Sequence, residues 1–221
     1  MVGYSPGMKR TIFLGLGALM AIAGSAALAS TVASDWTIGP HIRGRNYSVG
    51  MPLQPAPTRN GWAFAFPYPD RSAGHVHYVT HDPGSLAGKS RIVVRYRVDA
   101  APGTRFVPQE HPELPGTVSM VIQQRGDNWK AKGRFEHYRW YSPAAKVQEI
   151  RPGEHQMTLS LDDPAWISVY GRPASENPRA HREALANSAR LGLVFGSTAA
   201  RGHGVYATAP ARFELVSIRV E

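Results

Sequence analysis

Short segments that alternate between apolar and polar residues, separated by glycine- and proline-rich turns, dominate this chain. The clearest is Arg91–Val98, in which every second residue is apolar and most of the others are arginine. A period of two residues is typical of a strand that has one buried face. The segment Thr117–Gln124 repeats the pattern. The predicted inward-facing residues are Ile92, Val94, Tyr96 and Val98 in the first segment and Val118, Met120 and Ile122 in the second.

Further strands are expected along the whole second part of the chain. Arg125–Asn128 reads as a turn, and Arg134–Tyr141 is expected to return as the second strand of that hairpin. Glu154–Leu161 is expected to bury Met157, Leu159 and Leu161. The other candidate strands are Trp36–Gly39, Trp62–Phe66, His75–Thr80, Trp166–Tyr170, Arg190–Phe195, Gly204–Thr208 and Arg212–Val220.

One helix is predicted. Asn177 is suited to the N-cap, Pro178 to the first helical position, and the residues up to about Ser188 are rich in helix formers. With 22 glycines, 18 prolines and no repeat of fixed period, the chain suits many short strands better than a helical bundle. The sequence therefore predicts an all-β fold: an antiparallel β-sandwich of jelly-roll type, with one short helix at about 177–188, in a single domain over residues 30–221.

The N-terminal residues have the pattern of a signal peptide. Lys9 and Arg10 precede an uncharged run, Thr11–Ser34, that contains the sequence Ala27-Leu28-Ala29. A basic region, an apolar region and an A-x-A site are typical of secretory signals. We expect residues 1–29 to be removed after Ala29, which predicts a periplasmic or secreted protein with no stable membrane insertion. The alternative is an uncleaved membrane anchor, since the run is long enough to span a bilayer.

Composition excludes several classes of protein. The chain has no cysteine, which rules out a disulfide scaffold, a cysteine-ligated metal site, a thiol enzyme and a bacterial lipoprotein. The formal net charge of +9 raises the question of a nucleic-acid partner. Lys9 and Arg10 leave with the predicted signal, the remaining arginines are spread along the strands, and export separates the chain from cytoplasmic nucleic acid. We therefore expect no nucleic-acid partner.

The late segments Leu191–Gly196 and Ala211–Leu215 resemble the closing strands of secreted carbohydrate-binding modules of the galactose-binding-like β-sandwich group. The similarity covers about the last hundred residues and is one of strand pattern. It implies sugar binding on a concave sheet face or at loop tips. No single residue can be carried over from the family, and function has to be argued from sites.

A histidine pair is the first candidate site. On a strand, His75 and His77 point to the same face, which could present two imidazoles to a metal or a substrate. A metal site would need a third ligand, for which the candidates are His81, His203, Glu136 and His137. The alternative is a solvated strand face with Val76 and Tyr78 on the core side. No metal or other cofactor is predicted.

The second candidate site is the hairpin around Trp129 and Phe135–Tyr141. Its aromatic and charged residues, notably Tyr138, Arg139 and Trp140, could form a platform for sugar rings and sugar carboxylates. The alternative is that these aromatic rings fill the space between the two sheets.

The third candidate site is the small-residue loop Gly196–Gly204. His203 lies between glycines in this loop and could contact a ligand. The alternative is that the segment is an ordinary turn.

Two functions follow from these candidates. The first is non-catalytic binding of a polysaccharide or cell-envelope glycan, including acidic glycans, through Trp129, Tyr138, Arg139, Trp140, His75, His77 and His203. The alternative is a jelly-roll polysaccharide lyase that acts on a uronate-containing polymer. Its catalytic candidates are His77, His137, Tyr138 and Arg139. The chain lacks the G-x-S-x-G elbow of serine hydrolases and the signatures of the alginate-lyase group.

Overall fold

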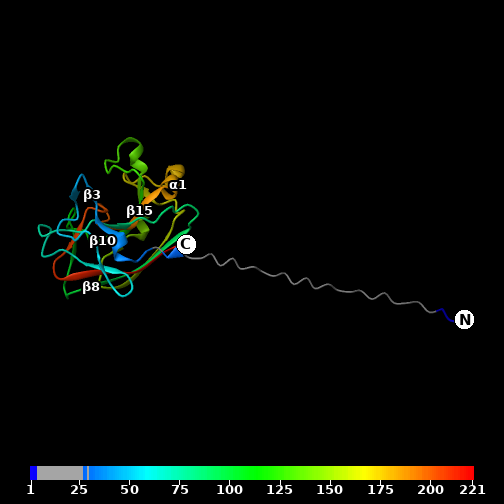
Figure 1. Cartoon of the computed structure of the whole chain (residues 1–221), viewed down its shortest axis with the longest axis horizontal. Helices are drawn as coiled ribbons and strands as arrows, with labels where there is room; N and C mark the ends of the chain where they lie inside the picture. Colours follow the sequence, from blue (N-terminus) through cyan, green and yellow to red (C-terminus); the bar gives the residue numbers. More distant parts are fainter. Residues whose placement is uncertain (4–26, 29) are drawn as a thin grey trace.

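The computed structural model describes residues 1–3, 27–28 and 30–221, so the predicted signal peptide lies almost wholly outside the described residues. Two antiparallel sheets pack face to face, and Figure 1 shows β8 in one layer with β10 and β15 in the other. None of the helices in the described part of the chain has the length and apolar character needed to cross a bilayer.

Eight strands form the body of the sandwich. Sheet A contains β6 (Trp62–Ala65), β17 (Ala211–Val220), β8 (Arg91–Ala100) and β13 (Gly153–Ser160) in that spatial order. Sheet B contains β7 (Tyr78–His81), β15 (Ser188–Gly196), β10 (Thr117–Gln124) and β11 (Arg139–Tyr141). The chain alternates between the sheets except where β11 directly follows β10 in sheet B. This connectivity is that of a jelly roll, so the predicted antiparallel sandwich is confirmed.

Shorter elements extend the sheets and close their ends. At the sheet edges lie β1 (Ala27–Leu28), β2 (Trp36–Gly39), β5 (Ala56–Pro57), β12 (Gln148–Glu149) and β14 (Ile167–Ser168). Two separate ribbons pair β3 (His41–Ile42) with β4 (Arg45–Asn46), and β9 (Phe106–Pro108) with β16 (Val205–Ala207). The helical elements are η1 (Ala33–Asp35), η2 (Gly133–His137), η3 (Ala144–Lys146) and α1 (Pro178–Ala186).

The alternating residues of the long strands build the core between the sheets. All the inward-facing residues predicted in β8 and β10 are buried, as are Met157, Leu159 and Leu161 at β13. Aromatic rings fill the centre: Phe213 stacks on Phe64 with ring centroids 5.4 Å apart, and Phe195 meets Phe213 edge-on. Because large rings bury the most apolar area per residue, this cluster is a main source of the sandwich's stability.

The predicted strand Arg134–Tyr141 is wrong over its first five residues. Gly133–His137 is a 3-10 helix, and extended backbone begins only at Arg139. The cause is local: Trp129, Ala131 and Gly133 all have left-handed backbone, with φ values of 64°, 52° and 59°. Left-handed residues cannot continue a pleated strand, so the chain leaves the turn as an irregular segment that runs into the 3-10 helix, and only the last three residues pair with β10.

The predicted strand His75–Thr80 begins later than expected, at Tyr78. Val76 makes a single bridge to Val205 before the strand starts. Val76 and Val79 both lie in the main core, which a regular alternation does not allow, so the chain is irregular between them. Tyr78 consequently lies on the outer face of sheet B with Val121, Tyr141 and Val194, and its predicted place on the core side is wrong.

Helix α1 confirms the single predicted helix. Asn177 occupies the N-cap position without a side-chain cap hydrogen bond, and Pro178 lies in the first turn. The buried face of the helix consists of His181, Ala184 and Leu185. The His181 ring contacts Trp140 and Trp166, with ring centroids 4.9 Å and 5.9 Å away. The helix therefore closes the sandwich beside β11.

Candidate functional site

A cleft of about 430 Å³ lies over the outer face of sheet B. Its floor comes from β7 and β11, one wall from Ile167–Gly171 around β14, and the other from the loop Thr198–His203. Tyrosine and arginine side chains lie among the lining residues, namely Tyr78, Tyr141, Tyr170, Arg139 and Arg201. Because this cleft combines several aromatic rings with two cations, we take it as the candidate binding site.

Two tyrosines join across the floor. The Tyr78 and Tyr141 hydroxyls lie 2.8 Å apart in a hydrogen bond that reaches across β15 and β10. Both rings are buried against Val121 and Val194. Burial raises the pKa of Tyr78 well above its usual range, and the neighbouring Tyr141 adds to the shift. A side chain at Gly202 would collide with the Tyr78 ring, so the loop lies directly over this tyrosine.

Arg139 is held beneath the surface by a buried ion pair. Its Nε lies 2.8 Å from Asp127 Oδ2, and the two side chains are 8% and 0% exposed. Its terminal nitrogen donates to the Trp129 carbonyl at 3.1 Å, and its guanidinium lies 4.8 Å from the Trp129 ring centroid. Gln123 donates to the same Asp127 oxygen at 2.8 Å. The carboxylate thus fixes Arg139, and Arg139 fixes Trp129 at the edge of the floor.

Arg201 differs from Arg139 because no carboxylate neutralises it. It is half-buried in the cleft and donates to the Ser142 carbonyl. No ion pair within 4.0 Å joins it to an acidic side chain of residues 30–221. Burial lowers the pKa of the Arg201 guanidinium, but arginine stays protonated at neutral pH. A partly desolvated cation without a counter-charge favours an anionic ligand.

The mouth of the cleft carries Tyr170 and His203. The Tyr170 ring is 57% exposed at the tip of the β14 wall, where it can stack on a ligand. His203 is exposed on the facing loop, and its Nδ1 lies 2.9 Å from Glu110 Oε1. The two groups flank the entrance on opposite walls.

The structure brings some predicted site residues together and separates others. Arg139 and His203 line the cleft, and Trp129 packs against Tyr78 and Arg139 beside it. Trp140 does not: it is fully buried between the sheets and donates to the His137 carbonyl at 2.7 Å, so the core-packing alternative holds for it. The inward direction follows from β11 alternation, which turns Arg139 and Tyr141 outward and Trp140 inward.

Two further candidates, His137 on η2 and Tyr138 directly after it, are not among the residues that line the cleft. The His137 ring stacks on Trp140 and pairs with Glu136 at 2.8 Å. Tyr138 packs edge-on against Phe135. Among the described residues, no hydrogen bond, ion pair or ring contact joins His137 or Tyr138 to the Arg139 guanidinium or to the tyrosine pair. The catalytic candidates that are adjacent in sequence therefore face different surroundings.

His75 and His77 are neighbours, as predicted, but they lie behind the cleft loop. Their ring centroids are 4.6 Å apart, and both rings pack against Gly204. His77 Nδ1 is 2.7 Å from the Gly202 carbonyl, on the side of the loop opposite Tyr78. In the described ranges, no three His, Cys, Asp or Glu side chains group closely enough to hold a metal ion.

The sequence did not single out Tyr78, Tyr141, Tyr170 or Arg201 as site residues. Arg201 stands within the glycine-rich loop that was noticed for His203, and Tyr141 shares the predicted outward face of Arg139. The glycine-rich loop could therefore have indicated Arg201, and the shared strand face could have indicated Tyr141. Tyr170 carries no such signal, because only the fold places the β14 wall beside the 198–203 loop.

Comparisons with known proteins add little to the site. No protein-family model matches the chain, and no curated protein is significantly similar to it. One solved structure is similar in overall form: a carbohydrate-binding module, CBM28, specific for non-crystalline cellulose. The two share 12% identity with a TM-score of 0.45, over 90% of this chain and 95% of that chain. The ligand of this chain has to be inferred from its own cleft.

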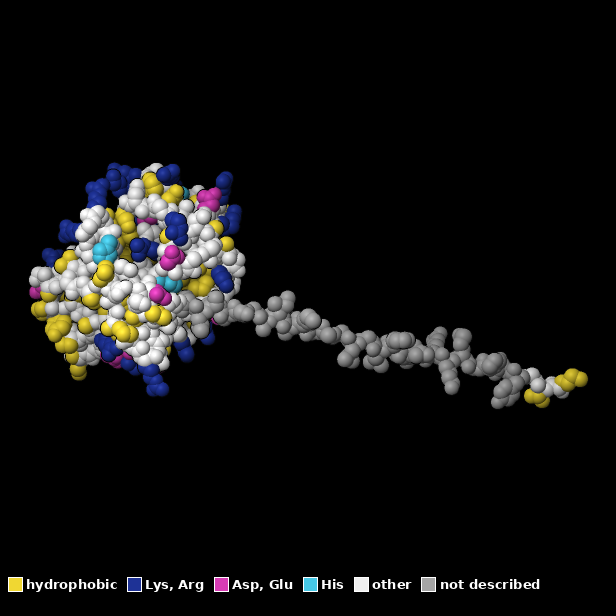
Figure 2. All heavy atoms as spheres, viewed as in Figure 1, with side chains coloured by type: hydrophobic (Ala, Val, Ile, Leu, Met, Phe, Trp, Pro, Cys, Tyr) yellow, Lys and Arg dark blue, Asp and Glu magenta, His cyan; other side chains and the backbone are white. Residues whose placement is uncertain are grey.

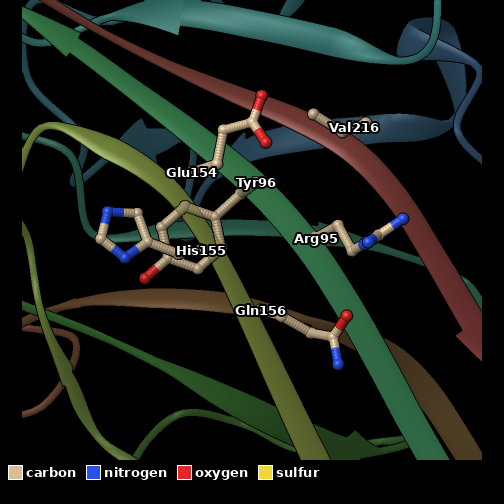
Figure 3. Close-up of a pocket in the computed structure, with 6 residues that line it drawn as sticks. All are labelled: Arg95, Tyr96, Glu154, His155, Gln156 and Val216. Atoms are coloured by element: carbon tan, nitrogen blue, oxygen red, sulfur yellow. The ribbon is translucent and has the colours of Figure 1, made fainter.

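A second hollow, of about 330 Å³, lies on sheet A where β17 bulges at Val216. Figure 3 shows the Tyr96 and His155 rings facing one another there, beside Arg95, Glu154 and Gln156. The Tyr96 ring is 1% exposed beneath His155 and cannot stack on a ligand. Because Arg95 is well exposed and an acidic group lines the same hollow, this surface has no unbalanced, desolvated charge.

Buried histidines predict a loss of stability in acid. Burial lowers the pKa of His181 to about 4, and Arg182 adds to the effect; burial likewise lowers the pKa of His77 to about 4. An unfolded histidine titrates near 6.5. The stabilisation from each neutral ring is therefore complete above about pH 6.5 and is lost as pH falls toward 4, by about 2–3 kcal/mol per ring at pH 4.5.

Urea unfolding of His181→Leu at pH 7 and pH 4.5 measures this dependence. The difference in unfolding free energy between the two pH values should shrink by about 2 kcal/mol relative to the unmodified protein. His41→Leu, at an exposed position, is the control and should leave the difference unchanged. If the unfolding free energy depends on pH equally in the unmodified protein and in His181→Leu, the acid sensitivity does not come from the buried His181 ring, and its assignment to that ring is contradicted.

Proposed function

We propose that this chain is an exported carbohydrate-binding protein whose cleft holds a segment of an acidic polysaccharide without catalysing its cleavage. The observation that carries the proposal is Arg201, a half-buried cation that no described carboxylate neutralises. A sugar carboxylate entering the cleft would supply that counter-charge through charge-assisted hydrogen bonds.

The rest of the cleft suits a sugar ring. Tyr170 offers an exposed aromatic face at the mouth, and aromatic faces pack against the apolar face of a pyranose. Trp129 lies at the edge of the floor, fixed by Arg139 and edge-on to Tyr78 with centroids 5.4 Å apart. The combination of one cation, exposed ring surface and hydroxyl groups matches the chemistry of a uronate residue.

The groups present favour binding over elimination chemistry. A lyase needs a base that can take a proton near neutral pH. The pKa of Tyr78 is raised by burial, which keeps its hydroxyl protonated. His77 lies on the far side of Gly202, and His137 is paired with Glu136. The candidate bases His77 and His137 therefore do not line the cleft, and the histidine that does, His203, is exposed at its mouth and paired with Glu110.

A glycan panel tests the proposal. We expect binding to at least one of alginate, hyaluronan and polygalacturonate, and weaker or no binding to laminarin, cellulose and xylan. Tyr170→Ala should lower the affinity about 2- to 10-fold through loss of ring stacking. The control is Tyr68→Ala, which removes another exposed ring remote from the cleft. Absence of binding to all three acidic polymers would overturn the proposal.

The same panel distinguishes binding from cleavage. Elimination within a uronate polymer creates an unsaturated product that absorbs near 235 nm. We expect no increase in absorbance on prolonged incubation with any of the three acidic polymers. A steady increase that Arg201→Gln abolishes would establish the lyase alternative instead.

A further inference from the structure

The segment between β10 and β11, residues 126–137, carries an unneutralised cluster of positive charge. We call it the cationic arm. Lys130, Lys132 and Arg134 are all exposed on it. None of the three forms an ion pair with an acidic side chain of the described residues. Exposed cations with no counter-charge create a positive potential over this end of the molecule.

Neighbouring elements do not neutralise the positive charge of the cationic arm. Helix α1 contacts η2 and presents exposed Arg182 on the same end of the molecule. The nearby acidic groups are already engaged: Glu136 with His137, and Glu183 with Arg179. Figure 2 shows Lys and Arg side chains gathered at the top of the molecule, the end at which Figure 1 draws α1 and the green segment between β10 and β11.

The arm begins at the edge of the cleft. Trp129 packs against the floor through Tyr78 and Arg139, and Lys130 follows it directly. Asp127, which is buried beneath Arg139, anchors the start of the arm, and buried Ala131 anchors its middle. The arm therefore starts next to the cleft, with the Trp129 ring between the cleft floor and Lys130.

The backbone of the arm is held in an unfavourable conformation. Trp129 and Ala131 are non-glycine residues with φ values of 64° and 52°, a region that costs about 1–2 kcal/mol per residue. Such conformations persist where the surrounding structure enforces them, and they cluster at functional segments. In this segment the Trp129 ring packs against the Arg139 guanidinium, while Lys130 and Lys132 are exposed.

We propose that the cationic arm is a second part of the binding surface, which holds the continuation of an acidic polysaccharide whose first residues occupy the cleft. This rests on the proposed function and adds to it that the ligand is a polyanionic chain longer than the cleft. Arg201 gives the cleft its specificity for a carboxylate, and the arm adds affinity that grows with chain length and falls with salt.

Oligosaccharides of two lengths test the role of the cationic arm. They are prepared from the acidic polymer that binds the protein most tightly in the glycan panel. A tetrasaccharide and a chain of about 20 residues are titrated against the unmodified protein and the triple variant K130Q/K132Q/R134Q. The unmodified protein should bind the long chain more tightly, and the variant should lose about tenfold of that affinity while binding the tetrasaccharide normally. The control R59Q/R95Q/R219Q removes the same charge from other exposed sites and should bind both lengths normally.

The outcomes separate the two proposals. If the unmodified protein binds no tetrasaccharide, the proposed cleft function fails. If the tetrasaccharide binds but the arm variant matches the control on the long chain, only the inference about the arm is overturned. Retained long-chain binding together with lost binding to phosphatidylglycerol vesicles or to single-stranded DNA would assign the arm to another polyanion and also overturn it. The inference about the arm would be supported if the affinity increases with the length of the oligosaccharide and 0.5 M NaCl removes this increase.

Discussion

Replacing Arg201 by glutamine is expected to weaken the binding of an acidic oligosaccharide by about 10- to 100-fold, the range for one charge-assisted hydrogen-bonded contact. The effect should be large because Arg201 is half-buried and no described carboxylate competes for it. Isothermal titration with the bound tetrasaccharide measures the change. A thermal melt checks folding, since the variant also loses the hydrogen bond to the Ser142 carbonyl.

Arg95→Gln is the matched control for this variant. It removes the same charge from the hollow on sheet A and should leave the affinity within about twofold, because Arg95 lies on the other sheet, away from the cleft. The opposite pattern, with Arg95 important and Arg201 dispensable, would move the binding site to sheet A and contradict the assignment.

The second large effect concerns stability. Asp127→Asn should lower the free energy of unfolding by about 3–5 kcal/mol, because it leaves the Arg139 guanidinium buried without a counter-charge. Urea denaturation at pH 7 measures the loss. The double variant Asp127→Asn/Arg139→Gln should recover part of it, since removing both charges avoids the uncompensated one.

A surface ion pair provides the comparison. Asp99 pairs with Arg97 at 3.2 Å, with the two side chains 54% and 43% exposed. Asp99→Asn should therefore cost less than about 1 kcal/mol. Similar losses for Asp127→Asn and Asp99→Asn would show that the Asp127–Arg139 pair is not buried as described, and would remove the reason for the fixed position of Trp129.

The sequence predicts most of the fold because the sandwich is built from locally readable strands. The alternation in β8 follows from burial of one strand face, and the alternating Val118, Met120 and Ile122 of β10 enter the core between the sheets although the other face of that strand is buried as well. The prediction fails where backbone conformation depends on individual residues. Nothing in the composition of Arg134–Tyr141 reveals that Trp129 and Ala131 adopt left-handed backbone ahead of it.

The site was harder to predict because it is assembled from distant parts of the chain. Tyr78 and Tyr141 meet across two intervening strands, and Arg201 reaches them from a loop after β15. Arg139 and Trp129 were predicted because they are close in sequence and share one hairpin. Trp140 shows the limit of that reasoning, since an aromatic residue between two site residues on a strand points to the opposite face, into the core.

The central claim is that an unneutralised Arg201 selects a carboxylate-bearing sugar. The most direct measurement compares a uronate oligosaccharide with its carboxyl-reduced, neutral counterpart by isothermal titration against the unmodified protein. The two ligands differ only in the group that Arg201 is expected to bind. We predict that the acidic form binds at least about tenfold more tightly, and that Arg201→Gln removes this preference. Equal or tighter binding of the neutral form would contradict the claim.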